Sequence, residues 1–149
     1  KPSLIKEASD SFGCQCIVLA IDAYKDQSNF KSGYNVSTHG GKKKTDIDAL
    51  EWAIEGEKNG AGEILLTSMN ADGTKLGYDI ELTSKISTEL RIPVIASGGA
   101  GKPIDMVNVL SKGNASAVLA ASIFHFGIYS IENVKKEMLK YRIPVRNKW

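Results

Sequence analysis

Short apolar runs alternate along the chain with longer segments in which apolar side chains recur at helical spacing. The apolar runs predict strands at residues 16–21, 63–67, 93–97 and 117–121. The helical spacing predicts helices at residues 3–12, 46–59, 79–90, 103–112 and 130–140. The helix at 103–112 has Pro103 in its first turn and Gly113 after its end, which is typical of helix termini.

The alternation of strands and helices predicts an α/β fold with a parallel sheet. The spacing between strands fits either a doubly wound sheet or a TIM (β/α)8 barrel. The run at 16–21 has no polar alternation, so we expect that strand to be buried on both faces. The one long connection, residues 23–45, alternates around Ser32 and Gly33 and therefore indicates a small hairpin.

The number of strands is half of what a barrel needs. A (β/α)8 barrel has eight strands, whereas four are found here, and the first helix has no strand before it. We therefore expect residues 1–149 to form a single domain, a half barrel of four parallel strands with helices. Open sheet edges favour association, so we expect either a second copy of the chain or a missing half to cover them.

Charge and cysteine content narrow the classes of function. The formal net charge of +2 is too small to indicate a nucleic-acid partner, and no apolar run approaches the roughly 18 residues needed to cross a membrane. Cys14 and Cys16, at the start of a predicted strand, are expected to be reduced thiols on one face, as in a cytoplasmic protein. The chain has neither a metal-ligand cluster nor a nucleotide fingerprint, so we expect no cofactor.

Small or polar side chains follow the predicted strands, which is where the active sites of parallel α/β folds lie. Asp22 follows the first strand and is a candidate general acid or base, with a turn cap as the alternative. Glu63 and Thr67 share one strand face. If Thr67 lies at the barrel mouth, Glu63 points inward at the opposite end and needs a partner for its charge; the alternative is a surface glutamate. His39, in the long connection, is expected to be a loop residue, with catalysis as the alternative.

Two glycine-rich or small-residue turns are candidates for binding a phosphate. Residues 97–102 (SGGAGK) join a strand to a helix, and Gly98 and Gly99 let backbone N–H groups approach an anion. Ala121 and Ser122 follow the last strand and can begin a short helix near the same phosphate. The alternative is a tight turn without a ligand.

Seven segments together resemble the cyclase subunit of imidazole glycerol phosphate synthase. They are residues 18–23 (VLAIDA), 38–43 (THGGKK), 60–69 (GAGEILLTSM), 72–75 (DGTK), 77–79 (GYD), 95–101 (IASGGAG) and 120–126 (AASIFHF). The similarity covers essentially the whole chain and corresponds to strands 5–8 of that family. The sister isomerase of histidine biosynthesis shares the barrel, but residues 67–79 resemble the cyclase more closely. One departure is Lys44-Thr45-Asp46, where the family often has Pro-Thr-Gly.

The resemblance implies an enzyme of histidine biosynthesis. Such cyclases form a TIM barrel that receives ammonia from a glutaminase partner in a heterodimer. The ammonia converts a bis-phosphorylated ribulosyl aminoimidazole intermediate into imidazole glycerol phosphate and aminoimidazole carboxamide ribotide.

The same resemblance implies roles for individual residues. Asp22 matches one of two catalytic aspartates, and Glu63 matches a charged ring at the barrel bottom, where ammonia enters. The positions that match substrate contacts are Thr67, Asp72, Gly73 and Ser97, and those that match one of two phosphate sites are Gly98, Gly99, Ala121 and Ser122. The other aspartate and the other phosphate site belong to the first half of the family's barrel, so we expect this half alone to be inactive.

Two alternatives remain open at this point. One is an isolated half barrel, paired with a copy of itself, that binds phosphate without turnover. The other is a paralogue of the cyclase in a surface-polysaccharide pathway.

Overall fold

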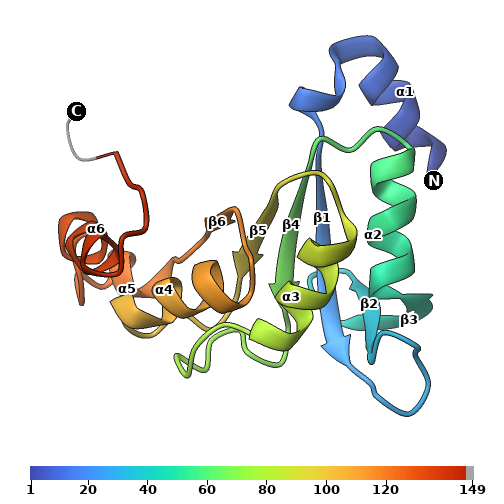
Figure 1. The fold of residues 1–149 in the computed structure, drawn as a ribbon. Helices are drawn as coiled ribbons and strands as arrows, with labels where there is room; N and C mark the ends of the chain where they lie inside the picture. The colour runs from blue at the N-terminus through green and yellow to red at the C-terminus, as the bar shows by residue number, and fades with distance from the viewer. Residues whose placement is uncertain (147–149) are drawn as a thin grey trace.

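The computed structural model describes residues 1–146 (Figure 1). The helices are α1 (Ser3–Phe12), α2 (Ala49–Lys58), α3 (Ile80–Glu89), α4 (Pro103–Lys112), α5 (Ser122–His125) and α6 (Ile131–Lys140), with a 3-10 turn η1 (Cys14–Cys16) after α1. The strands are β1 (Val18–Lys25), β2 (Tyr34–Thr38), β3 (Lys43–Asp48), β4 (Glu63–Ser68), β5 (Val94–Ser97) and β6 (Ala117–Val118).

The six strands form one mixed sheet in the order β3-β2-β1-β4-β5-β6. The pairs β1–β4, β4–β5 and β5–β6 are parallel, which confirms the four parallel strands. The hairpin expected in the long connection is also present, because β2 and β3 add to the edge of β1 as antiparallel strands. The sheet is therefore not purely parallel, and β6 has two residues where a strand was predicted at 117–121.

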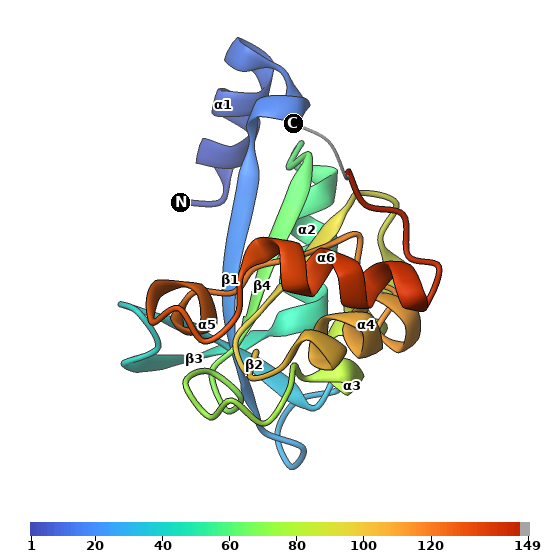
Figure 2. The same ribbon diagram turned by 90° about the vertical axis from the view of Figure 1, so that its left-hand side faces the viewer.

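Helices cover only one face of the parallel strands (Figures 1 and 2). The side chains of Ile21, Ile64 and Val94 point to the helices and are at most 1% exposed. The alternate side chains of the same strands are exposed or half-buried, and Val18 in β1 is 49% exposed. The prediction that residues 16–21 are buried on both faces is wrong for this chain. We call the uncovered side of β1, β4, β5 and β6 the open face.

The start of α2 differs from the predicted residue 46 because Asp48, the last residue of β3, caps the helix. Its carboxylate accepts hydrogen bonds from the backbone N–H groups of Leu50 at 2.8 Å and Glu51 at 3.2 Å. A third bond comes from the buried N–H of Ser32 at 2.7 Å. Although burial alone would raise the pKa of Asp48, these N–H donors hold it below its usual value. The cap thus fixes the hairpin and α2 to each other.

The two cysteines lie outside the strand in which the sequence placed one of them. Cys14 and Cys16 are the ends of η1, and β1 begins only at Val18. Both thiols are free and exposed, as expected for reduced cysteines. The prediction that the two share one face of a strand is wrong, because both belong to the 3-10 turn. Gly62 packs on the backbone of Cys14, since a Cβ at Gly62 would lie 2.1 Å from the Cys14 carbonyl oxygen. This contact holds the turn against the amino end of β4.

Candidate functional site

Three of the predicted site residues form a row across the carboxyl ends of neighbouring strands. Asp22 in β1 is in register with Thr67 in β4, and Thr67 is in register with Ser97 in β5. All three are half-buried. Along β1, β4 and β5 buried and less buried side chains alternate, and these three are on the less buried side, which is the open face. Parallel strands are about 4.8 Å apart, so the row spans roughly 10 Å, and an extended ligand lying along it can contact all three side chains.

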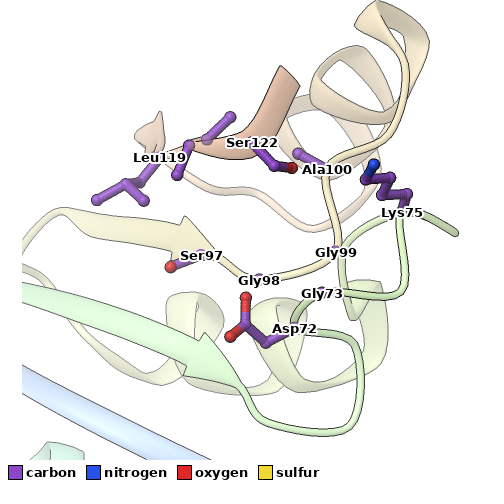
Figure 3. A pocket seen from close by; sticks show the side chains of 11 residues that line it. Asp72, Gly73, Lys75, Ser97, Gly98, Gly99, Ala100, Leu119 and Ser122 are labelled. Carbon is purple, nitrogen blue, oxygen red and sulfur yellow. The ribbon is translucent and has the colours of Figure 1, made fainter. Parts of the chain in front are cut away.

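A cavity of about 130 Å³ lies directly beside Ser97, at the end of this row. Three connections surround it: β4–α3, β5–α4 and β6–α5. The lining contains seven predicted site residues, which are Asp72, Gly73, Ser97, Gly98, Gly99, Ala121 and Ser122. Figure 3 shows Gly98 between Asp72 on one side and Ser122 on the other. The structure thus brings both candidate phosphate turns to one cavity.

The cavity is small for a ligand pocket. Sites for whole ligands typically measure roughly 300–1,000 Å³. A volume of about 130 Å³ suits one terminal group of a larger molecule. Asp22 and Thr67 do not line the cavity, so a ligand anchored there would extend along the row toward them.

Close backbone packing explains the glycines of the β5–α4 connection. Gly99 has φ +102°, in the left-handed region that glycine adopts without strain. A Cβ there would lie 2.0 Å from the carbonyl oxygen of Gly77, in the β4–α3 connection. Gly77 donates its N–H to the Gly99 carbonyl at 2.8 Å. At Gly98, with φ +88°, a Cβ would lie 2.8 Å from the Ser68 carbonyl oxygen. A side chain at either position would push the two connections apart.

Tyr78 and Asp79 do not line the cavity, but their hydrogen bonds fix the β4–α3 connection beside it. The sequence did not indicate either of them as a site residue. Tyr78, 7% exposed, donates its hydroxyl to the Leu119 carbonyl at 2.9 Å and so ties the β4–α3 connection to the end of β6. Burial, with a smaller contribution from Asp105, raises the pKa of Tyr78, which stays a neutral donor. Asp79 accepts from the Ser68 hydroxyl at 3.1 Å and from the Leu82 N–H at 3.0 Å, and caps α3.

Lys75 is a further lining residue that the sequence reasoning passed over. Its neighbours across the cavity, such as Ala100 and Ser122, are distant in sequence, so segment 72–75 alone does not indicate its place there. The cavity-lining Leu119, which is 43% exposed on the open face, was missed for the same reason.

Glu63 lies at the opposite end of the open face. It is in register with Val18 and shares the less buried side of β4 with Leu65 and Thr67. Parity in the sequence predicted that Glu63 and Thr67 share a face, and the strand confirms it. Within residues 1–146 no ion pair involves Glu63, so the predicted partner for its charge is not among them.

The other features of the chain do not join this site. His39 is exposed at the tip of the β2–β3 hairpin with φ 57°, and its Nδ1 lies 3.0 Å from the Thr38 hydroxyl. The part of the chain that the structure describes holds no group of three or more metal-ligating side chains. None of its helices combines the length and apolarity that crossing a membrane requires.

Comparisons with known proteins match the chain to one family. The sequence profile of a family described as "Histidine biosynthesis protein" matches residues 1–130. The chain is 56% identical over 145 residues to the "Imidazole glycerol phosphate synthase subunit HisF" of Dehalococcoides mccartyi strain BAV1, covering 97% of the chain and 56% of that protein. Proteins of the same name match at 51% identity in Methanosarcina mazei and in Corynebacterium diphtheriae, covering 97% and 99% of the chain.

The chain spans about half the length of these relatives, since it covers 58% of each of the latter two. The matched profile includes β1 to β6 and thus every residue of the row and of the cavity. On this match and on these identities, the chain belongs to the histidine biosynthesis protein family.

Proposed function

We propose that this chain is the second half of the barrel of an imidazole glycerol phosphate synthase cyclase subunit. In that role it helps to convert ammonia and a bis-phosphorylated ribulosyl aminoimidazole intermediate into imidazole glycerol phosphate and aminoimidazole carboxamide ribotide. The single observation that carries the proposal is the in-register row of Asp22, Thr67 and Ser97 leading to the cavity. The names of the relatives support the same reaction.

Asp22 is the acid–base residue that this half contributes. Its carboxylate is half-buried at the mouth of the open face, where it can reach a substrate and still exchange protons with solvent. Its backbone is held on both sides, by the parallel ladder with β4 and by the Ser37 hydroxyl, which donates to the Asp22 carbonyl at 3.1 Å. The second carboxylate of the acid–base pair comes from the first half of the barrel.

The hydroxyl and carboxylate groups beside Asp22 orient the substrate. Thr67 and Ser97 present hydroxyls that can donate to and accept from the ribulosyl chain. Asp72 and Gly73, on the rim of the cavity, contact the same end of the substrate. These contacts fix the reacting atoms over Asp22, which is how positioning lowers a barrier.

One phosphate of the substrate occupies the cavity. Gly98 and Gly99 have no side chains, so backbone N–H groups can lie against phosphate oxygens. Ala121 and Ser122 complete the wall with small side chains, and Ser122 adds a hydroxyl donor. The other phosphate binds in the first half of the barrel.

The open face is the surface that the first half of the barrel covers. Val18 is 49% exposed and Leu119 43% exposed there, and Ala20 and Ala117 are also exposed. Because about half of each of these two side chains is already covered, burying the rest would contribute roughly 1 kcal/mol each. The relatives' greater length favours a covering half over a second copy of this chain. Self-association is the alternative, and it would leave a phosphate-binding scaffold without turnover.

Glu63 belongs to the ammonia gate at the amino ends of the strands. We infer that a glutaminase subunit docks at this end and that the charge of Glu63 pairs with a basic side chain of the first half. The reaction uses no cofactor and takes place in the cytoplasm.

The test is Asp22→Asn in the barrel completed with the first half of the relative from D. mccartyi. The amide keeps the shape of the side chain and removes its proton-transfer chemistry. We expect cyclisation to fall by at least about 10²-fold, the lower end of acid–base contributions, while substrate affinity changes little. Asp26→Asn is the matched control, because Asp26 lies just beyond β1 and, within residues 1–146, its carboxylate accepts side-chain hydrogen bonds from the Asn29 amide alone. Wild-type turnover by Asp22→Asn would overturn the proposal.

A further inference from the structure

Lys75 is the one described residue lining the cavity that carries a positive charge, and Asp72 is the one that carries a negative charge. Figure 3 shows Lys75 at one end of the cavity, beside Ala100 and Gly99. A phosphate dianion entering the cavity would meet the carboxylate of Asp72, and like charges repel. A cation beside the cavity would offset this repulsion.

The backbone at Lys75 is held in an unfavourable conformation. Lys75 has φ 59°, in the left-handed region where a residue with a Cβ is strained. Its carbonyl packs against Gly101, since a Cβ at Gly101 would lie 2.0 Å from the Lys75 oxygen. The Thr74 hydroxyl donates to the Ala71 carbonyl at 2.7 Å and accepts from the Leu76 N–H at 3.2 Å, which closes the turn. Glycine would adopt this backbone conformation at lower cost, so the lysine here carries a local conformational penalty. Such outliers cluster at ligand-binding positions.

The ammonium of Lys75 is not committed to a carboxylate. Within residues 1–146 it forms no ion pair. Its Nζ instead lies 6.0 Å from the ring centroid of Phe126, a weak cation–π contact. Phe126 is 69% exposed and directly follows α5, the helix that begins with the cavity residue Ser122. The His125 ring lies edge-on to Phe126, with centroids 5.0 Å apart. The ring thus keeps the ammonium near the cavity without neutralising it.

We propose that Lys75 is the side chain that neutralises the phosphate group in this cavity, and that Phe126 holds its ammonium at the rim while the cavity is empty. The inference rests on the proposed function, because that function places a phosphate there. When phosphate binds, the ammonium leaves the ring and donates to a phosphate oxygen. A charge-assisted hydrogen bond replaces a weak contact at an exposed ring, so the exchange favours the bound state.

The experiment titrates the protein with inorganic phosphate and follows backbone amide resonances by NMR. Lys75→Met keeps the length of the side chain and removes its charge. We expect at least tenfold weaker phosphate binding, as for the loss of one charge-assisted hydrogen bond, and a smaller dependence of affinity on salt. Lys75→Arg should retain most of the affinity. Lys112→Met is the matched control, because Lys112 is exposed in the last turn of α4, at the end away from the β5–α4 connection, and does not line the cavity. It should change the affinity less than twofold.

Lys75→Gly is a second variant that cannot fail through backbone strain, since it relieves the left-handed conformation. It should also bind phosphate at least tenfold more weakly. Unchanged affinity in Lys75→Met and Lys75→Gly, with the amides of Gly99 and Ser122 still shifting, would overturn the role of Lys75 alone. Failure of these two amides to shift in the wild-type protein would instead overturn the proposed phosphate site itself.

Discussion

Gly99→Ala tests whether backbone-to-backbone packing builds the cavity. The new Cβ would stand 2.0 Å from the Gly77 carbonyl oxygen, whereas carbon and oxygen atoms normally come no closer than about 3.3 Å. The two connections would have to separate by roughly 1 Å. Such overpacking costs about 1–3 kcal/mol. The left-handed φ of +102° adds about 1–2 kcal/mol for a residue with a Cβ.

The separation would also stretch the hydrogen bond from the Gly77 N–H to the Gly99 carbonyl, now 2.8 Å, which contributes about 1 kcal/mol. We therefore expect Gly99→Ala to lower the free energy of unfolding by about 3–6 kcal/mol, measured by urea denaturation. Phosphate binding at the cavity should be lost in the fraction that stays folded. Gly40→Ala is the matched control, because Gly40 also has a positive φ, +63°, but a Cβ there would meet no atom within 4 Å. Its free energy of unfolding should fall only by the cost of the left-handed backbone conformation, about 1–2 kcal/mol. Equal losses in the two variants would refute the role assigned to close packing.

Three further predictions concern the cap, an ion-pair cluster and the open face. Asp48→Ala should lower the free energy of unfolding by about 2–4 kcal/mol, since it removes a helix cap and leaves the buried Ser32 N–H unpaired; Asp46→Ala is the control, and an equal loss there would contradict the assignment. Hydrogen bonds from Lys25 and Lys85 lower the pKa of Glu81 from 4.5 to about 2. The stability that this cluster contributes should therefore be fully present above about pH 4.5 and be lost as the pH falls toward 2. Glu81→Gln should flatten that part of a pH series of thermal unfolding curves, and an unchanged curve would exclude the cluster as the cause. Leu65→Ala, on the open face, should weaken binding of the first half of the barrel at least tenfold in sedimentation experiments; unchanged binding would show that another surface is covered.

Local signals in the sequence located the helices whose ends are set by their own residues. The helix at 103–112 was predicted to the residue, because Pro103 and Gly113 bound it. The start of α2 was placed too early because Asp46 and Asp48 are equivalent as local caps. Only the sheet decides between them: residues 43–48 pair with β2 as an edge strand, and Asp48 is the first residue free to cap. β3 itself is largely polar, so no apolar run marked it.

The row of Asp22, Thr67 and Ser97 could be anticipated because all parallel strands end at the same edge of a sheet. The open face could not, since a continuous apolar run looks the same whether one or both faces are covered. Tyr78 was missed because its role depends on Leu119, 41 residues away. The backbone of Lys75 is held by its close packing against Gly101, which belongs to another connection. No pattern in the sequence around Lys75 could therefore indicate that packing.

The most direct test of the central claim is product analysis on the chain mixed with the first half of the barrel of its relative, with an ammonium salt and the bis-phosphorylated substrate. If the chain is the second half of a cyclase, a one-to-one complex should form and release imidazole glycerol phosphate. A chain that pairs only with itself, binds phosphate and releases no product would contradict the account.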